Sequence, residues 1–419
     1  MNYSFVEGLQ CLECGQKYPK QPGYVCEHCF GPLEVAYDYE KIRSVLTKEK
    51  INSRSHSMWR YRELLPVAGP VYDTHIGFTP LIRADKLAKK LGIQEVWIKN
   101  DAANHLSLSF KDRVVGVALA CAQEFGYGTV GCSSTGNLAH AVAAYGAANG
   151  LDSYVFVPAD CRDELVAIAN MYGARVIGVD GTYDEVNRLC SEIAGEYDWA
   201  FVNINFRPYY IEGSKTIGFE IAEQLGWKLP GHIVVPMASG ALLVNIFKAF
   251  TELNTIGMIP DTEVCIHGAQ PKGCSPIIDA VLSGSETVIP VEKPDTIVSS
   301  LAVGDPGDGF YAVRTIGKSG GSGANPDDRD AMEGVKLLAE CEGILSELAG
   351  GVVVSAARQL RENGKIADND SVVLCITGSG MKSNMIVNTS SNVIKTIKPN
   401  LEQFEKHLLK NIENLGENV

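Results

Sequence analysis

Residues 129–150 read TVGCSSTGNLAHAVAAYGAANG, and this stretch passes from one kind of secondary structure to another. The run TVGCSS is short and rich in β-forming residues, which predicts a strand. The loop SSTGN follows it, and the run NLAHAVAAYGAANG has helix formers and a closing glycine, which predicts a helix. A strand, a glycine-containing loop and a helix in this order are typical of a parallel α/β sheet.

The same alternation continues on both sides of this unit. From about residue 93 the chain alternates short β-rich runs with helical stretches, and several runs are apolar throughout, as in strands buried on both faces. The predicted strands cover residues 95–100, 129–134, 152–158, 174–180, 200–205, 232–237, 263–270 and 372–377. We therefore expect an α/β protein with one or two parallel sheets.

Length and composition limit the class of protein. A chain of 419 residues exceeds the size at which a single core stops growing, so two domains and an appendage are expected. The formal net charge of -13 repels nucleic acid phosphates and anionic membranes, so we expect a small-molecule partner, no nucleic acid and no membrane. An anionic substrate would then need local positive charge or backbone N–H groups inside a cleft.

The apolar and cysteine patterns predict a cytoplasmic protein. No apolar run reaches about 18 residues, and the opening MNYSFVEGLQ lacks the features of a signal peptide. Eight of the 12 cysteines are scattered between residues 121 and 375 in apolar or glycine-rich settings. Such settings are typical of buried, reduced thiols.

The other four cysteines form two C-x-x-C pairs near the start of the chain. With eleven residues between the pairs, they are Cys11, Cys14, Cys26 and Cys29. Two such knuckles suit tetrahedral binding of zinc by thiolates, so we expect a ribbon-like module that could hold structural zinc. Inert cysteines are the alternative. A nucleic-acid-binding ribbon is disfavoured because the module's basic residues, Lys17 and Lys20, are too few.

Three glycine-containing loops follow predicted strands. They read SSTGN, ASGALL and TGSGMKS, after the strands at 129–134, 232–237 and 372–377. In open α/β sheets, ligands bind beyond the carboxyl ends of the strands. One such loop is a weak signal. Three of them with interleaved hydroxyl residues indicate a ligand site.

A lysine stands where a helix is expected to begin, in the run HLSLSFKDRVV at residues 105–115. Burial and the positive end of a helix dipole favour the free amine, the form of Lys111 that can make a Schiff base. One loop could bind a phosphate and another a carboxylate through backbone N–H groups. Together these features indicate a pyridoxal phosphate site for an amino-acid substrate. A solvated surface lysine is the alternative.

Seven motifs carry a resemblance to a known family. In order they read NHLSLSFKDRVV, SSTGNLAHAVAAYGA, FVNINFRPYYIEGSKTIGFEIAEQLGW, GAQPKGCSPI, AVGDPGDGFYAV, EGILSELAGG and ITGSGMK. From about residue 9 to the final helix, the chain resembles threonine synthase of the fold type II pyridoxal phosphate enzymes. The resemblance implies a tryptophan synthase β-like fold, with two open parallel-sheet αβα domains plus a small amino-terminal four-cysteine ribbon.

The resemblance also implies a division of the chain and a homodimer as its assembly. The implied parts are a ribbon at 1–35, a large cofactor-binding domain at 36–110 plus 206–398, a small domain at 111–205 and a carboxy-terminal helix at 399–419. The tail NLEQFEKHLLKNIENL independently predicts that helix, because its apolar residues fall on one face.

Particular residues match functional positions of the family. Lys111 matches the lysine that holds the cofactor and then moves protons between substrate carbons. Asn137 matches the asparagine that hydrogen-bonds the cofactor's ring oxygen, and Thr377 the hydroxyl residue that faces its pyridine nitrogen. The loop implied to bind the cofactor phosphate is Ala238, Ser239, Gly240, Ala241 and Leu242. The residues implied to bind the substrate are Ser133, Ser134, Thr135 and Gly136 for its carboxylate, and Asn203, Asn205 and Arg207 for its phosphate.

The structural alternative for Asn203, Asn205 and Arg207 is a buried polar strand end with an arginine ion pair. Lys215 and Lys272 are further candidates for the phosphate, although each could equally be a solvated lysine. The implied activity is that of a lyase, which converts O-phospho-L-homoserine and water to L-threonine and phosphate by γ-elimination and β-addition of water.

Departures from the family's pattern keep alternatives open. They fall at Leu106, Ser107, Leu348 and Ser379. A paralogue acting on another activated amino acid, or a deaminase of the threonine/serine dehydratase type, is the enzymatic alternative. A zinc-ribbon protein whose α/β body has become a non-catalytic binding module is the alternative from another class.

Overall fold

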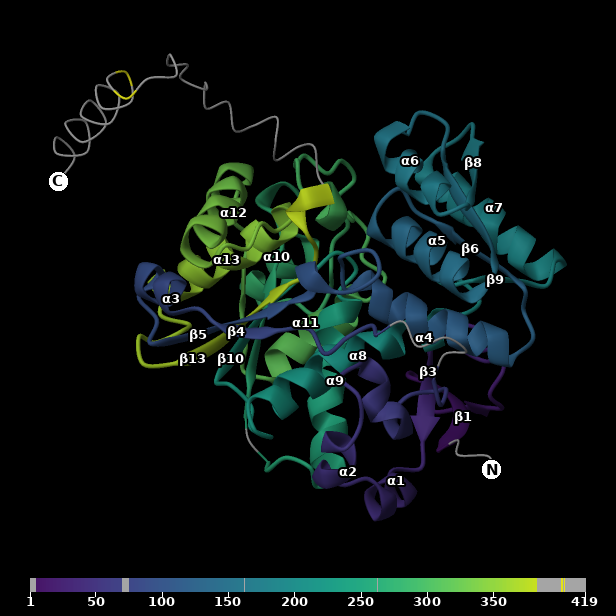
Figure 1. The fold of residues 1–419 in the computed structure, drawn as a ribbon, viewed down its shortest axis with the longest axis horizontal. Helices are drawn as coiled ribbons and strands as arrows, with labels where there is room; N and C mark the ends of the chain where they lie inside the picture. The colour runs from purple at the N-terminus through teal and green to yellow at the C-terminus, as the bar shows by residue number, and fades with distance from the viewer. Residues whose placement is uncertain are drawn as a thin grey trace. The chain divides into compact units, whose positions relative to one another are not determined.

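The computed structural model describes residues 5–69, 75–161, 163–261 and 263–382, together with Leu401 and Gln403 (Figure 1). The chain divides into two compact units, Met1–Lys382 and Ser383–Val419. Apart from two residues, the helix expected at 399–419 lies outside the described part of the chain. In that part, no helix is long and apolar enough to cross a bilayer.

The strands of the first unit form three sheets within the described residues. These strands are β1 Val6–Cys11, β2 Lys17–Tyr18, β3 Leu33–Tyr37, β4 Leu81–Arg83, β5 Glu95–Asn100, β6 Thr129–Ser133, β7 Asp152–Pro158, β8 Arg175–Val179, β9 Trp199–Phe201, β10 His232–Pro236, β11 Cys265–Ala269, β12 Gly323–Ala324 and β13 Ser371–Ile376. The sheet orders are β2-β1-β3, β12-β11-β10-β13-β5-β4 and β8-β7-β6-β9. Two separate α/β sheets and an amino-terminal ribbon confirm the expected fold class.

Helices connect most of these strands. The α-helices of the first unit are α1 Tyr39–Val45, α2 Lys48–Asn52, α3 Asp85–Leu91, α4 Lys111–Glu124, α5 Asn137–Asn149, α6 Asp163–Met171, α7 Tyr183–Glu196, α8 Arg207–Gln224, α9 Ala241–Thr255, α10 Pro276–Ser283, α11 Gly309–Lys318, α12 Asp328–Glu342 and α13 Leu348–Glu362. The 3-10 helices are η1 Met58–Leu64, η2 Asp101–Ala103, η3 Lys272–Cys274, η4 Ser299–Leu301 and η5 Gly380–Lys382. In each α/β sheet, a helix therefore begins shortly after a parallel strand ends.

The six-stranded sheet forms the larger core. Its neighbouring strands are parallel except at the edge, where β4 runs antiparallel to β5. Ile98, Ile233 and Val373 in three adjacent strands are completely buried, as expected for strands covered on both faces. Figure 1 shows α12 and α13 on one side of this sheet and α8 and α9 on the other.

The four-stranded sheet is parallel throughout, with β6 between β7 and β9. The predicted strand at 200–205 is shorter in the structure, because β9 ends at Phe201. The Asn205 side chain accepts a hydrogen bond from the Phe201 N–H at 2.8 Å and donates one to the Trp199 carbonyl at 3.0 Å. These bonds close a turn, and the chain then enters α8.

The ribbon is anchored to the body by a buried cluster of charges. The Tyr37 hydroxyl at the end of β3 donates to Glu212 of α8 at 2.6 Å. Lys215 lies between Glu212 and Glu252, at 2.5 and 2.9 Å, and Lys248 of α9 reaches Glu212 at 3.2 Å. Because these groups are buried and mutually paired, the ribbon is fixed against the α8–α9 pair.

Candidate active site

Lys111 is the first residue of α4, and the loop after β13 holds this helix start in place. The Phe110 N–H donates to the Thr377 carbonyl at 2.9 Å, and Ser109 forms an antiparallel bridge with Gly378. The predicted pair Lys111 and Thr377 therefore meets at the carboxyl end of β13. This is the edge of a parallel sheet where ligands bind.

Two aromatic rings surround the Lys111 amine. Its Nζ donates to the Tyr210 hydroxyl at 2.8 Å and lies 4.6 Å from the centre of the Phe110 ring. The lysine is only partly buried, so the core does not enclose it completely. An amine held by one hydroxyl group can form a bond to the carbonyl carbon of a ligand bound beside it, which is the requirement for a covalent lysine adduct.

Asp112 and Arg113, the residues after Lys111, explain the sequence KDR at this helix start. Asp112 accepts hydrogen bonds from the Ser107 N–H at 3.0 Å and from the Ser109 N–H at 3.4 Å, and so ties down the preceding loop. Burial raises the pKa of the Asp112 carboxyl to about 6. Arg113 turns the other way, into the core, where it is completely buried.

A cluster of buried ion pairs supports the back of α4. Arg113 contacts Asp101 at 2.6 Å and Glu220 of α8 at 2.5 Å, and Lys99 of β5 contacts Glu220 at 2.5 Å. Burial alone would raise the pKa of Glu220, but the charges of Arg113 and Lys99 outweigh it and lower the pKa to about 2. Glu220 is therefore ionised, and it joins the helix that carries Lys111 to the helix that carries Tyr210.

Asn137 begins α5 and contacts residues from two distant segments, one of which also reaches the loop before Lys111. Its Nδ2 donates to Glu347 at 2.8 Å, while the Lys382 amine donates to Asn137 Oδ1 at 2.5 Å and to the Ser107 carbonyl at 2.6 Å. Burial lowers the pKa of Lys382 and raises the pKa of Glu347. A Cβ at Gly378 would lie 2.6 Å from the Glu347 carboxylate, so a larger residue there would displace the side chain that holds Asn137.

The loop at 238–242 runs from the end of β10 into α9, and Gly240 caps that helix. Gly240 has a φ of +97°, and a Cβ there would lie 2.8 Å from Ala312. The Ser239 carbonyl accepts a hydrogen bond from the Asp308 N–H at 3.1 Å, which ties the loop to the start of α11. A glycine turn at a helix amino terminus directs N–H groups at one point, so the loop fits a phosphate group.

The loop at 133–136 connects β6 to α5. Ser133 is completely buried, and its hydroxyl contacts the side chains of Asn187 and Asn203. Ser134 accepts a hydrogen bond from the Gly136 N–H at 3.3 Å, and Gly136 caps the helix. Ser133 therefore stabilises the loop from its buried side. The partly exposed residues that follow it can present N–H groups to a carboxylate.

The three residues expected to bind a substrate phosphate have different environments. Arg207 begins α8 and pairs with Asp308 at 2.5 Å, while Asn203 donates to Ser133 at 3.2 Å. The other amide atom of Asn203, Oδ1, is buried and has no hydrogen-bond partner among the described residues. Asn205 uses both ends of its amide on backbone groups, as the interpretation of a buried polar strand end expected.

The two further lysine candidates lie elsewhere. Lys215 is completely buried between two glutamates of the cluster behind the ribbon, so it is neither solvated nor available to a ligand. Lys272 is exposed at the start of η3.

Two of the four departures from the family's pattern lie beside this site. Ser107 accepts the Lys382 amine through its carbonyl, and its hydroxyl lies 3.3 Å from that of Ser109. Ser379 is buried and donates its N–H to the Leu108 carbonyl at 3.0 Å. The other two are Leu348, the buried first residue of α13, and Leu106, which is partly buried against the core.

Sequence reasoning missed four side chains that complete the site. They are Tyr210, Asp308, Glu347 and Lys382. All four belong to the motifs FVNINFRPYY, AVGDPGDGFYAV, EGILSELAGG and ITGSGMK, so the available signal was the position of a polar residue within a recognised motif.

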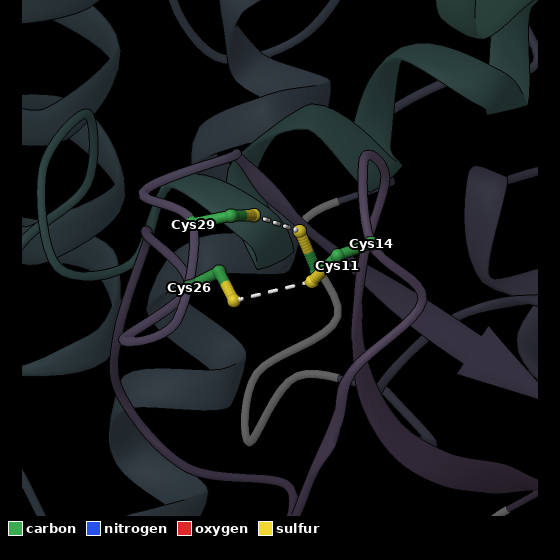
Figure 2. Close-up of side chains that lie close together, drawn as sticks. All are labelled: Cys11, Cys14, Cys26 and Cys29. Carbon is green, nitrogen blue, oxygen red and sulfur yellow. Dashed lines mark hydrogen bonds between the residues drawn. The ribbon is translucent and has the colours of Figure 1, made fainter.

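The four amino-terminal cysteines form one cluster (Figure 2). Their sulfur atoms all lie within 4.8 Å of one another, and the Cys11–Cys29 and Cys14–Cys26 pairs are 3.4 and 3.6 Å apart. Four thiolates around zinc at about 2.3 Å would stand roughly 3.8 Å apart, so the cluster fits such an ion. The hydrogen bond between Tyr18 and Cys26 lowers the pKa of this thiol to about 6, which favours the thiolate that binds metal.

Comparison with known proteins agrees with this geometry. Residues 72–378 match the family described as "Pyridoxal-phosphate dependent enzyme". More than half of the chain is matched, so this protein belongs to that family of enzymes. Such a cofactor requires a lysine for its covalent attachment, and Lys111 lies at the start of α4 beside the carboxyl end of β13.

Within this family, the relatives most similar to this chain include several threonine synthases. The chain is 37% identical to the threonine synthase of Methanosarcina acetivorans over 380 residues, 89% of this chain and 92% of the relative. It is 37% identical to that of Methanocaldococcus jannaschii over 379 residues, again 89% of this chain and 92% of the relative. The expected family is therefore confirmed.

Solved structures show the same fold at lower identity. Maize serine racemase aligns with a TM-score of 0.62 and 19% identity, over 75% of this chain and 93% of the racemase. Threonine deaminase isoform 2 from Solanum lycopersicum aligns with a TM-score of 0.61 and 23% identity, over 74% of this chain and 82% of the deaminase. At such identities the likeness concerns the fold alone.

Proposed function

We propose that the protein is a threonine synthase, a pyridoxal phosphate-dependent lyase that converts O-phospho-L-homoserine and water to L-threonine and phosphate. The observation that carries this conclusion is 37% identity to threonine synthases along nearly their whole length. The site agrees, because it combines a lysine with two loops that can bind anions and with Arg207 nearby.

The site has places for each part of the cofactor. The loop at 238–242 would bind its phosphate through the amino terminus of α9, Lys111 would hold it covalently, and Asn137 would reach its ring oxygen. Thr377, directly after β13, would face its ring nitrogen. Bound pyridoxal phosphate supplies an electron sink for negative charge that develops on substrate carbons.

Lys111 would then act as the base and acid of the reaction. Its Nζ stands between Phe110 and Tyr210, so a proton taken from the substrate α carbon stays on an amine shielded by two rings. The Tyr210 hydroxyl accepts a hydrogen bond from this amine and orients it. A single base that moves protons at neighbouring substrate carbons must be held in a fixed orientation and must remain accessible to the substrate.

The substrate would be held at both ends. Its carboxylate would meet the N–H groups of residues 134–136 at the start of α5, and its phosphate would meet Arg207 and Asn203. Arg207 already pairs with Asp308, so phosphate binding would exchange one anionic partner for another without burying an unpaired guanidinium. Asn205 would support the turn before Arg207.

The deciding experiment supplies O-phospho-L-homoserine to the purified holoenzyme and measures phosphate and the amino-acid product. Threonine and phosphate in equal amounts support the proposal, whereas 2-oxobutanoate and ammonia would show a deaminase. Arg207→Gln should raise KM for the phosphorylated substrate. The matched control is Arg329→Gln, because that arginine is exposed and pairs only with Glu333 within the described residues. Bound cofactor without turnover would mean that the departures at Leu348 and Ser379 mark another substrate.

We further propose a cytoplasmic homodimer with the division expected from the resemblance. The proposed parts are a ribbon at 1–35, a large domain at 36–110 plus 206–398, a small domain at 111–205 and a final helix at 399–419. All the described cysteines are free thiols, which suits a reducing compartment. The molar mass in solution tests the assembly, and limited proteolysis tests the boundaries.

A further inference from the structure

The pair of Arg207 and Asp308 joins the starts of two helices at the place proposed for the substrate phosphate. Arg207 is the first residue of α8, and Asp308 directly precedes α11. The pair links one guanidinium nitrogen, Nη2, to one carboxylate oxygen, Oδ1, at 2.5 Å. The two side chains are 25% and 13% exposed, so the core encloses neither of them completely. The guanidinium proposed to bind phosphate therefore already holds an anionic group of the protein itself.

The backbone of Asp308 is fixed, whereas its side chain can rotate. Its N–H donates to the Ser239 carbonyl at 3.1 Å, and its carbonyl accepts a hydrogen bond from the Ala312 N–H at 2.9 Å. The side chain makes no capping bond to α11, although aspartate is among the residues most favoured before a helix start. Within the described residues, the carboxylate bonds to Arg207 alone. It can therefore leave Arg207 without moving the loop proposed to bind the cofactor phosphate.

A phosphate group and the Asp308 carboxylate compete for Arg207 with different advantages. A phosphate dianion carries more charge and can accept two parallel N–H bonds from a guanidinium, whereas Asp308 accepts one. Asp308 is attached to the protein, so its carboxylate stays beside Arg207 at a high effective concentration. The positive end of the α11 dipole would stabilise this carboxylate while it is displaced.

The outcome of this competition should change during the reaction. The phosphate of the substrate would be held at Arg207 and also through the substrate carboxylate, which would bind residues 134–136. Once the bond between phosphate and the substrate carbon is broken, free phosphate loses this second attachment. Its affinity falls, because attachment at two points raises the effective concentration of each group at its own place. Asp308 can then replace it.

We infer that Asp308 is an internal competitor that limits phosphate affinity at Arg207. Its carboxylate occupies the guanidinium between turnovers, yields to the phosphate of the substrate and returns to release the product phosphate. The inference rests on the proposed function, because that function places a phosphate at Arg207. The alternative is a structural role, in which Asp308 only orients Arg207 toward its ligand.

The test measures binding of radiolabelled inorganic phosphate to the holoenzyme by equilibrium dialysis, at constant ionic strength and at a pH where phosphate is mostly the dianion. Asp308→Asn removes the competing charge and keeps the shape of the side chain. The dissociation constant for phosphate should fall about tenfold, because Arg207 no longer has an ionised partner to release. A structural role predicts the opposite sign, since a guanidinium without its support would bind phosphate more weakly.

Three further variants show whether the effect passes through Arg207. In the Arg207→Gln background, Asp308→Asn should no longer tighten phosphate binding, because the guanidinium for which the anions compete is absent. Asp305→Asn removes the same charge from an exposed position of the same loop and should leave the affinity unchanged. Asp308→Ser removes the carboxylate but keeps a residue favoured before a helix start, so it should tighten binding as Asp308→Asn does.

Steady-state kinetics supply a second readout on the same variants. In Asp308→Asn, KM for O-phospho-L-homoserine and the inhibition constant of added phosphate should both fall. The value of kcat should not rise, because the substitution leaves Lys111 and its surroundings unchanged.

The inference is overturned if neither Asp308 variant binds phosphate more tightly than the wild type does. It is also overturned if Asp305→Asn tightens binding as much, or if the gain persists in the Arg207→Gln background, because the effect would then be general charge repulsion. An enzyme that shows the expected phosphate affinities but makes no threonine would contradict the proposed function and leave the inference standing. An enzyme that makes threonine while its phosphate affinity ignores Asp308→Asn would contradict the inference alone.

Discussion

The cysteine ribbon and the active site are constructed in opposite ways. The paired cysteines of the ribbon are 18 and 12 residues apart in the chain. In the active site, Lys111 and Tyr210 are 99 residues apart, and Asn137 and Lys382 are 245 residues apart. The ribbon is therefore a local structure, whereas the site exists only when the whole body has folded.

The difference shows where each region obtains its rigidity. Metal binding at four nearby thiolates would stabilise the ribbon locally. The active site instead depends on the cluster behind α4, in which Glu220 joins Arg113 to Lys99. Substitutions in the two regions should therefore differ in their effects. Those at the site should strongly reduce turnover or the free energy of unfolding, and those in the ribbon should change the kinetic constants only modestly.

The largest effect is expected for Lys111→Ala. Turnover of O-phospho-L-homoserine should fall by about 10⁴-fold or more, because no other amine replaces the proposed base. The apoenzyme should keep its unfolding midpoint, because Lys111 lies outside the buried ion pairs. The measurements are product formation and the visible absorption band of lysine-bound cofactor. Persistence of that band on the variant would assign the cofactor to another lysine.

Glu220→Gln tests the support behind the site. The substitution leaves Arg113 and Lys99 without their shared carboxylate in the core, so the free energy of unfolding should fall by about 3–5 kcal/mol. Urea denaturation followed by circular dichroism measures it. The matched control is Glu340→Gln on an exposed face of α12, where the change should stay within about 0.5 kcal/mol. Equal effects of the two substitutions would show that the cluster does not stabilise the body.

Lys382→Met tests the contact between the distant segments of the site. Asn137 would lose its donor and could rotate, so kcat should fall by about 10²-fold. Lys382→Arg should restore part of the activity, because a guanidinium can still donate to the same carbonyl and amide oxygens. The exposed Lys336→Met on α12 is the control. A loss confined to KM would contradict a positioning role near the cofactor and indicate one in substrate binding.

Asp112→Asn should give a pH-dependent effect. Burial raises the pKa of Asp112 from 3.8 to about 6, so the folded state holds this proton to a higher pH than the unfolded chain does. The protonated carboxyl therefore contributes its full share to the stability of the folded wild type below pH 3.8. This stability is lost as the pH rises through about 6. The destabilisation by Asp112→Asn should be about 2 kcal/mol larger near pH ~4 than near pH ~7.

Chemical denaturation at the two pH values measures this difference, and Asp85→Asn serves as the control because Asp85 is exposed on α3. A penalty for Asp112→Asn that does not change with pH would mean that Asp112 is ionised throughout this range. Its role would then be limited to accepting hydrogen bonds from the loop before Lys111.

The same contrast explains what the sequence alone could predict. Short runs of β-forming residues, VWI in one and YVFV in the other, located β5 and β7 to the residue. The spacing of the four cysteines predicted their cluster, since neighbouring residues set its geometry. Local patterns could not show that Lys382 meets Asn137, because sheet topology brings them together.

Other features of the site could be assigned only from the family resemblance or from the structure. The assignment of Lys111 depended on recognised motifs, because a single lysine before a helix has many uses. The pairing of Arg207 with Asp308 and of Asn205 with the backbone became visible only in the structure. The edge strand β4 was missed because three residues give too short a pattern.

The smallest effect is expected for Cys26→Ser, and it tests whether the ribbon is independent of the site. The ribbon contacts the segment before and after Arg207: the Gly23 N–H donates to the Asn205 carbonyl at 2.9 Å, and the Tyr209 hydroxyl donates to the Gln21 carbonyl at 2.8 Å. Loss of a metal ligand should loosen these contacts.

Each hydrogen bond contributes about 1 kcal/mol, so KM for the phosphorylated substrate should rise about fivefold while kcat changes less. Zinc content and steady-state kinetics measure the two effects together. Cys265→Ser is the control, because this partly buried thiol lies outside the ribbon. If Cys26→Ser removes the metal but leaves KM unchanged, the ribbon only stabilises itself. If KM rises in proportion to metal loss, the locally folded ribbon positions the turn that carries Arg207.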